Sequence, residues 1–98
     1  MHVGVCRLTL HIYASQSLKE KRRVVRSVSE RLRQKFSASV AEVDSQDKWQ
    51  LAVLGVSVVS GEAQRTHELV DAIIRFVAEF SPEAELTARD SEVFSYED

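Results

Sequence analysis

Residues 17–36 form the stretch that most constrains how this chain can fold, because they have the pattern of a capped amphipathic helix. Ser17 is a favoured N-cap residue, and Glu20 three residues later completes a Ser-x-x-Glu capping box. At about 100° per residue, the apolar residues fall on one side of this helix: Leu18, Val24, Val25, Val28, Leu32 and Phe36. The opposite side carries five cations and one anion: Lys19, Arg22, Arg23, Arg26, Arg33 and Glu30. The stretch therefore predicts a helix with one core face and one basic face.

The rest of the chain predicts four strands and a second helix around this first helix. The strands are expected over residues 3–13, 39–44, about 50–59 and 86–94, and the second helix over residues 62–80. Pro82 stops the second helix. The order β-α-β-β-α-β is the ferredoxin-like plan, which predicts an α+β fold with a four-stranded antiparallel sheet and both helices on one face. We expect residues 1–98 to form a single domain.

The predicted third strand is apolar on both of its faces, over residues 51–59. This pattern is typical of a strand covered on both sides. Two helices cover only one face, so the other face is either covered by a second subunit or a partner or left partly exposed. We expect a homodimer through this open face, with these residues at the interface: Val3, Val5, His11, Trp49 and Val53. The favoured interpretation of Trp49 is a packing or interface anchor, and a platform for base stacking is the alternative.

The formal net charge of −2 conceals a strong segregation of charge along the chain. Residues 17–36 hold eight Lys or Arg and two Glu, a balance of +6, whereas the remaining residues have a balance of −8. No apolar run approaches the ~20 residues that span a bilayer. The N-terminus lacks the pattern of a secretory signal, so a cytoplasmic location is expected.

The basic helix face is the main candidate site. Cations in the first turn of a helix oppose the positive end of its dipole, so local stability does not favour them. Several cations beside a helix N-terminus suit phosphate. We therefore predict nucleic-acid contacts from Lys19, Lys21, Arg22, Arg23, Arg26 and Arg33. The alternative is a solvated face whose charges pair with acidic residues elsewhere in the chain. Lys21 differs from the other cations because its helical angle lies inside the apolar stripe. Its stem is therefore expected to pack in the core and its ammonium to reach the end of the sheet.

Other candidate residues have simpler interpretations. Glu42, Asp44 and Asp47 surround a turn, but their spacing matches no calcium loop, so turn chemistry is the favoured interpretation. Cys6 is the only cysteine and is expected to be a buried thiol. The three histidines have no metal-ligand spacing. Because we find no catalytic constellation, we expect a non-catalytic protein with no cofactor and no bound metal.

Several segments resemble the YlxP-like family of small bacterial proteins. They are Val-Gly-Val at 3–5, Ser-Leu-Lys-Glu-Lys-Arg-Arg-Val-Val at 17–25, Val-Ala-Glu-Val-Asp at 40–44, Gln-Asp at 46–47, Trp-Gln at 49–50 and Leu-Gly-Val at 54–56. The resemblance extends to about Phe80. It implies a ferredoxin-like fold, no established catalytic activity, and a gene often next to translation and ribosome-maturation factors.

Charge and resemblance together predict a binding protein associated with RNA or a ribosomal particle through the basic helix face. The binding would be electrostatic, with little sequence readout. The alternative is a homodimeric regulatory or scaffold module with a ligand or partner site at the sheet or at the subunit junction.

Overall fold

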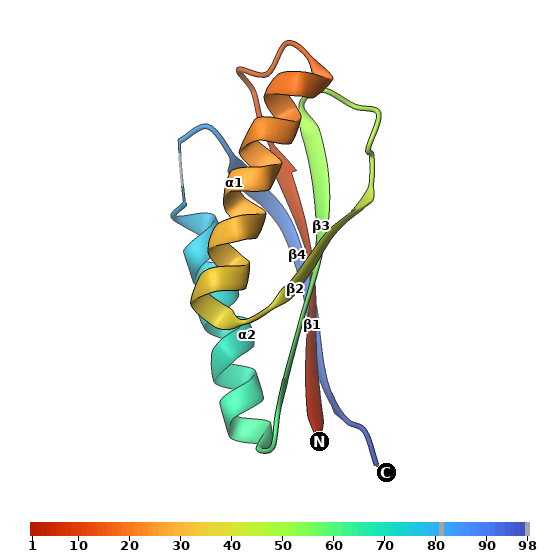
Figure 1. Cartoon of the computed structure of the whole chain (residues 1–98), viewed down its shortest axis with the longest axis vertical. Coiled ribbons are helices and arrows are strands. Elements are labelled where there is room, and N and C mark those ends of the chain that lie inside the picture. Colours follow the sequence, from red (N-terminus) through yellow and green to blue (C-terminus); the bar gives the residue numbers. More distant parts are fainter. Residues whose placement is uncertain (81, 98) are drawn as a thin grey trace.

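The elements of the structure follow the predicted order. The structure is a computed structural model that describes residues 1–80 and 82–97. Its elements are β1 (His2–His11), α1 (Leu18–Phe36), β2 (Ser39–Asp44), β3 (Leu51–Ser60), α2 (Ala63–Ala78) and β4 (Glu85–Ser95). The strands form one antiparallel sheet in the order β2-β3-β1-β4. Figure 1 shows both helices on the same side of this sheet. The predicted ferredoxin-like fold is therefore confirmed.

Helix α1 begins and ends as its sequence predicts. The Ser17 hydroxyl accepts the backbone N–H of Glu20 at 3.1 Å. The Glu20 carboxylate accepts the N–H of Gln16 at 2.7 Å, one residue before the cap position of an ordinary capping box. The helix ends at Ser37, whose left-handed backbone (φ 52°) directs its N–H to the Arg33 carbonyl.

The hydrophobic core lies between the sheet and the two helices. Leu8, Leu54, Val28 and Ile73, which come from two strands and both helices, are completely buried. Helix α2 lies very close to β1 at Gly4, where an added Cβ would be 2.6 Å from a Val70 methyl group. This close approach explains why a glycine interrupts the apolar row of β1.

The other face of the sheet has no helix over it and is only partly apolar. Val59, Val3 and Phe94 lie opposite one another on β3, β1 and β4 and form an apolar row. Val59 is 60% exposed and Phe94 is 40% exposed. Within the single chain, this row is partly exposed and available to a partner.

Element boundaries differ from the prediction mainly at their ends. β1 stops at His11 and not at Tyr13, and α2 spans Ala63–Ala78 with Glu62 as its N-cap. β4 is longer than predicted, at 11 residues, because it pairs with β1 from His2 to His11. Bulges at β2 and β4 also interrupt the ladders, between Glu42 and Asp44 and opposite Thr9 and Leu10.

Candidate functional site

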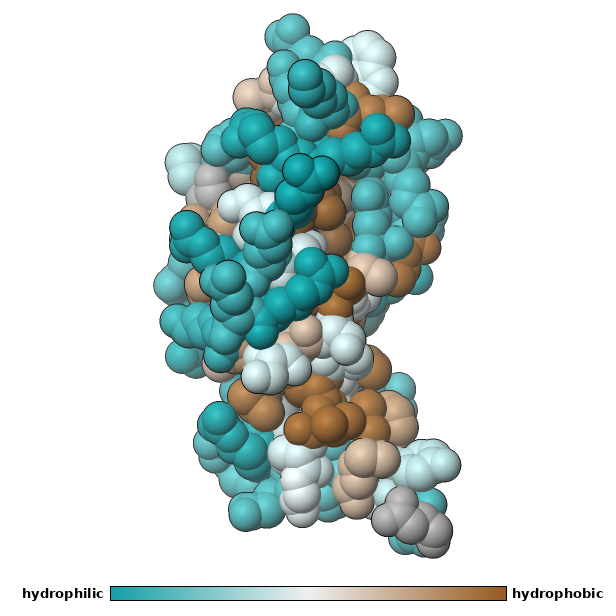
Figure 2. Space-filling view, viewed as in Figure 1, coloured by the Kyte–Doolittle hydropathy of each residue, from teal (hydrophilic) through white to brown (hydrophobic). Residues whose placement is uncertain are grey.

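The first turns of α1 carry an outward-facing hollow lined with cations. Lys19, Arg22, Arg23 and Arg26 line it together with Ser17 and Glu20, and its volume is about 590 Å³. Figure 2 shows hydrophilic residues gathered over α1 on this side of the molecule. The Glu20 carboxylate is already occupied by the Gln16 N–H. The hollow therefore presents several positive charges beside one engaged carboxylate.

The charged groups of three of these cations contact no partner among the described residues. Within residues 1–80 and 82–97, the side chains of Lys19, Arg22 and Arg26 form no ion pair or hydrogen bond. Arg26 does not pair with Glu30, although the two are four residues apart. Arg23 contacts Glu83 at 3.0 Å, but both side chains are exposed and such surface pairs contribute only about 0–1 kcal/mol.

Lys21 does not belong to the exposed basic face, and its inclusion among the nucleic-acid contacts was wrong. Its side chain is completely buried. The ammonium donates to the Glu42 carboxylate at 2.7 Å and lies 2.9–3.2 Å from three backbone carbonyl oxygens of the β2–β3 connection: Ser45, Gln46 and Leu51. The expected packing of its stem is confirmed, but the ammonium reaches protein acceptors and not solvent. Lys21 is thus a structural link between α1 and the β2–β3 turn (residues 45–50).

The remaining cations of α1 are partly occupied by the protein itself. Arg33 donates to the Val40 carbonyl at 2.8 Å on the edge strand β2. Arg31 lies 5.8 Å from the centre of the Phe80 ring, and Lys35 lies 5.3 Å from that of Phe76. The free positive charge is therefore concentrated in the first half of α1.

The three acidic residues around residues 42–47 have separate roles. Glu42 pairs with Lys21, and Asp44 pairs with Arg7 at 3.1 Å. Asp44 also accepts the N–H of Ser45, which has a left-handed backbone (φ 58°). Asp47 lies in the turn, and no group of three or more potential ligands in the described part of the chain is arranged to hold a metal.

The predicted interface residues occupy unequal positions on the open sheet face. Val3, Val5 and His11 are half-buried. Val53 is only 5% exposed, so it offers little surface to a second subunit. The exposed Arg7–Asp44 pair joins β1 to β2 across β3, the strand that carries Val53. Trp49 lies in the β2–β3 turn and is 55% exposed.

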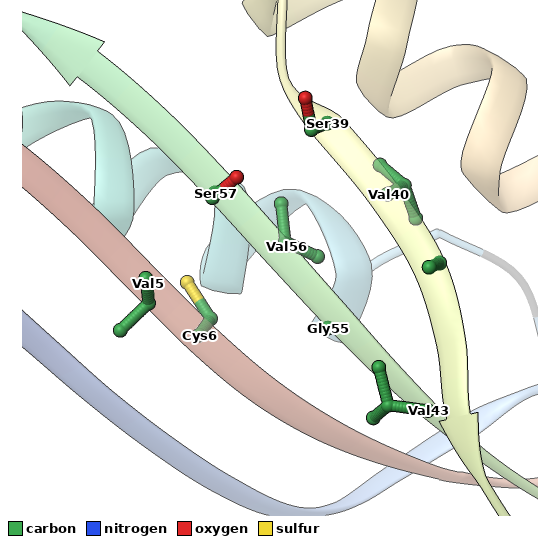
Figure 3. Close-up of a pocket in the computed structure, with 9 residues that line it drawn as sticks. Val5, Cys6, Ser39, Val40, Val43, Gly55, Val56 and Ser57 are labelled. Carbon is green, nitrogen blue, oxygen red and sulfur yellow. The ribbon is translucent and has the colours of Figure 1, made fainter.

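A shallow hollow of about 300 Å³ lies between β1, β3 and β2. Figure 3 shows Val5, Ser57 and Val43 around it, with Gly55 between them. The glycine leaves room that Val43 partly fills, since a Cβ at Gly55 would lie 2.8 Å from a Val43 methyl group. The lining has no charged side chain, so this hollow offers apolar contact and no evident chemistry.

The two groups with altered acidity do not form a catalytic site. Burial raises the pKa of the Cys6 thiol from 9.0 to about 11, with a smaller effect from the charge of Asp71. A thiol with such a pKa is a poor nucleophile near neutral pH. A hydrogen bond with Glu85 raises the pKa of the exposed Tyr13 hydroxyl. Cys6 is thus a core residue, as expected.

The fold and the sequence place the chain in the class of ferredoxin-like α+β domains. The profile of the family described as "Protein of unknown function (DUF503)" matches residues 3–91, and the chain belongs to this family. It is 34% identical over 92 residues to the Uncharacterized protein YlxP of Bacillus subtilis (strain 168), and this alignment covers 94% of this chain and 99% of that protein. The resemblance to the YlxP-like family is therefore confirmed.

Two solved structures resemble this chain over most of its length. A de novo designed protein with a ferredoxin fold, determined by NMR in solution, matches with a TM-score of 0.50 and 11% identity, covering 98% of this chain and 87% of the designed one. A dimeric ferredoxin-like protein of unknown function from Thermobifida fusca YX matches with a TM-score of 0.41 and 13% identity, over 96% and 92% of the two chains. In the described part of the chain, neither helix has the length and apolar character needed to cross a membrane.

Proposed function

We propose that this protein binds RNA, alone or within a ribosomal particle, through the basic face of α1. The observation that supports the proposal is a group of three cations around one hollow, Lys19, Arg22 and Arg26, for which the described residues provide no partner. The N-terminal end of α1 adds the positive end of the helix dipole to the same place. Phosphate groups are the natural counter-ions for such a surface.

The binding would depend on charge and carry little sequence information. Contacts from lysine and arginine to phosphates position a protein on a nucleic acid but do not distinguish bases. Each phosphate contact lowers the slope of log K against log salt by about 0.7 on single strands and 0.9 on duplexes. Three contacts therefore predict a slope of roughly −2 to −3.

A titration with structured RNA and with ribosomal subunits tests this proposal. The test variant carries Arg22→Glu and Arg26→Glu. The control carries Arg65→Glu and Arg75→Glu, which change net charge equally on α2. We expect the test variant to lose most of its affinity and salt dependence, and the control to retain both. If wild type, test variant and control bind equally, the α1 face is not the site.

A homodimer through the open sheet face is a second proposal, favoured by the exposed apolar row of Val3, Val59 and Phe94. The row lies on the face opposite the helices, so a second copy there would leave α1 accessible. Such a dimer would present two basic helices to one polyanion and increase avidity. Sedimentation equilibrium of wild type and Val59→Lys tests it: a monomeric wild type at micromolar concentration rules the dimer out.

A further inference from the structure

Trp49 is the only tryptophan of the chain, and its side chain is 55% exposed. A single exposed apolar side chain is common on protein surfaces. An exposed tryptophan is a stronger indication of an interface, because its large ring contributes most to stability or binding when it is buried in a core or an interface. The contacts of the neighbouring residues show whether the segment that carries this ring is held in place.

Hydrogen bonds fix the chain on both sides of Trp49. Before it, the Lys21 ammonium donates to the carbonyls of Ser45 and Gln46. After it, the Gln50 side-chain amide donates to the carbonyls of Tyr13 (3.0 Å) and Ser15 (3.1 Å), and the Gln50 carbonyl accepts the N–H of Ile12 at 2.8 Å. The turn is therefore anchored to α1 and to the end of β1, and it holds the ring outward.

The same contacts join the turn that carries Trp49 to the N-terminal end of α1. Gln50 bonds to Ser15, and the Ser15 hydroxyl donates to the carbonyl of Ser17, the N-cap of α1. The hydrogen bond from Arg33 to the Val40 carbonyl shows that the side of α1 that carries Arg33 faces β2. Arg22 lies about three helical turns earlier on the same side of α1. Figure 1 shows the connection between β2 and β3 beside the first half of α1.

Other rings and one more cation lie at this end of the sheet. Trp49, His11, Lys48 and Asp47 line a half-open hollow of about 510 Å³. The His11 ring lies against the Tyr13 ring, with 3.9 Å between their centroids, and Tyr13 is itself exposed. Asp47 and Lys48 offset each other's charge in this lining, so the hollow offers ring surface without a net charge, which suits the uncharged base of a nucleotide.

We propose that Trp49 stacks on an unpaired base of single-stranded RNA whose phosphates contact the cations of α1. This inference rests on the proposed function and narrows its ligand. Aromatic platforms beside a positive groove are how proteins bind single strands with little sequence preference. Bases within an A-form duplex are stacked on one another and offer no free face to a ring. The ligand class is therefore a single-stranded segment, such as a loop or an end.

Fluorescence of the lone tryptophan provides the test, with an oligomer of ten adenylates and a duplex RNA of equal length as probes. We expect the single strand to quench Trp49 and to bind more tightly than the duplex. For the variants that lack tryptophan, binding is followed by the fluorescence anisotropy of dye-labelled RNA, and Trp49→Ala should weaken binding of the single strand by roughly five- to 150-fold without changing the salt slope. Trp49→Phe should retain most of the affinity. Tyr96→Ala removes an exposed ring near the C-terminus and serves as the matched control.

The outcomes separate this inference from the proposed function. If Trp49→Ala binds the single strand like wild type while Arg22→Glu with Arg26→Glu does not, stacking is wrong and phosphate binding stands. If no RNA binds to the wild type, both are wrong. A Trp49→Ala variant that changes the sedimentation of the protein but not its RNA affinity makes the ring a protein interface and overturns the inference.

Discussion

Replacing Lys21 with methionine tests the buried contact that joins α1 to the β2–β3 turn. Methionine keeps most of the apolar stem and removes the ammonium. The Glu42 carboxylate, on a side chain that is 17% exposed, then loses its partner at 2.7 Å, and three carbonyls lose a donor. Removing one partner of a buried ion pair costs about 3–5 kcal/mol.

Partial hydration of Glu42 places the expected loss near the lower end, at about 3 kcal/mol of unfolding free energy. In a domain of 98 residues, such a loss lowers Tm by roughly 12–24 °C. Urea unfolding followed by far-UV circular dichroism measures it without depending on Trp49, which lies in the affected turn. Lys19→Met is the matched control, since Lys19 is exposed and is expected to change stability by less than about 0.5 kcal/mol.

A second variant separates the two parts of this contact. Lys21→Met together with Glu42→Leu removes both charges and restores the part of the loss that came from the stranded carboxylate. The carbonyls of Ser45, Gln46 and Leu51 remain without the ammonium, so only partial recovery is expected. If Lys21→Met unfolds within 1 kcal/mol of Lys19→Met, as measured in the same urea series, the reasoning is refuted.

Three further variants test single contacts. Ser17→Ala removes the hydroxyl that caps α1 and should lower the unfolding free energy by about 1 kcal/mol in urea titrations; no change would mean that the cap bond is not formed in solution. Gly4→Ala places a methyl group 2.6 Å from Val70 and should cost about 1–3 kcal/mol by the same measurement, whereas a stabilised variant would contradict the packing of α2 on β1. The raised pKa of Cys6, about 11, means that the folded state holds the thiol proton more tightly than the unfolded state. The stabilisation is therefore complete below about pH 9 and is lost toward pH 11, by roughly 2–3 kcal/mol at most. The stability difference between wild type and Cys6→Ala should shrink over that range, whereas an exposed thiol would leave it constant.

Local sequence patterns were sufficient to predict the fold because each element carries its own signal. The cap at Ser17 and the strand at Ser39–Asp44 were placed correctly from residue type and spacing alone. The burial of Val53 was not predictable in the same way. Burial on the open face depends on contacts between residues far apart in sequence, such as the Arg7–Asp44 pair, and on register shifts such as the one between Glu42 and Asp44, neither of which a local pattern predicts.

The sequence correctly located the basic helix, but it predicted more exposed positive charge on α1 than the structure has. The helical angle of Lys21 pointed into the apolar stripe, which was a usable signal of burial. Its carbonyl partners lie in a turn whose path depends on tertiary structure, so the role of the ammonium was not visible in the sequence. The Gln50 contacts that fix the exposed turn around Trp49 were missed for the same reason.

The alternative interpretation of the basic face, that its charges are neutralised within the chain, predicts ion pairs between α1 and the acidic remainder. In residues 1–80 and 82–97, such pairs join α1 only to Glu42 and Glu83, and the first of them is buried. Among the described residues, no carboxylate pairs with Lys19, Arg22 or Arg26, and Lys19 also lies in the first turn of α1, where the helix dipole disfavours a cation. The RNA proposed as ligand would stabilise this arrangement, because its phosphates would bring negative charge to the same place.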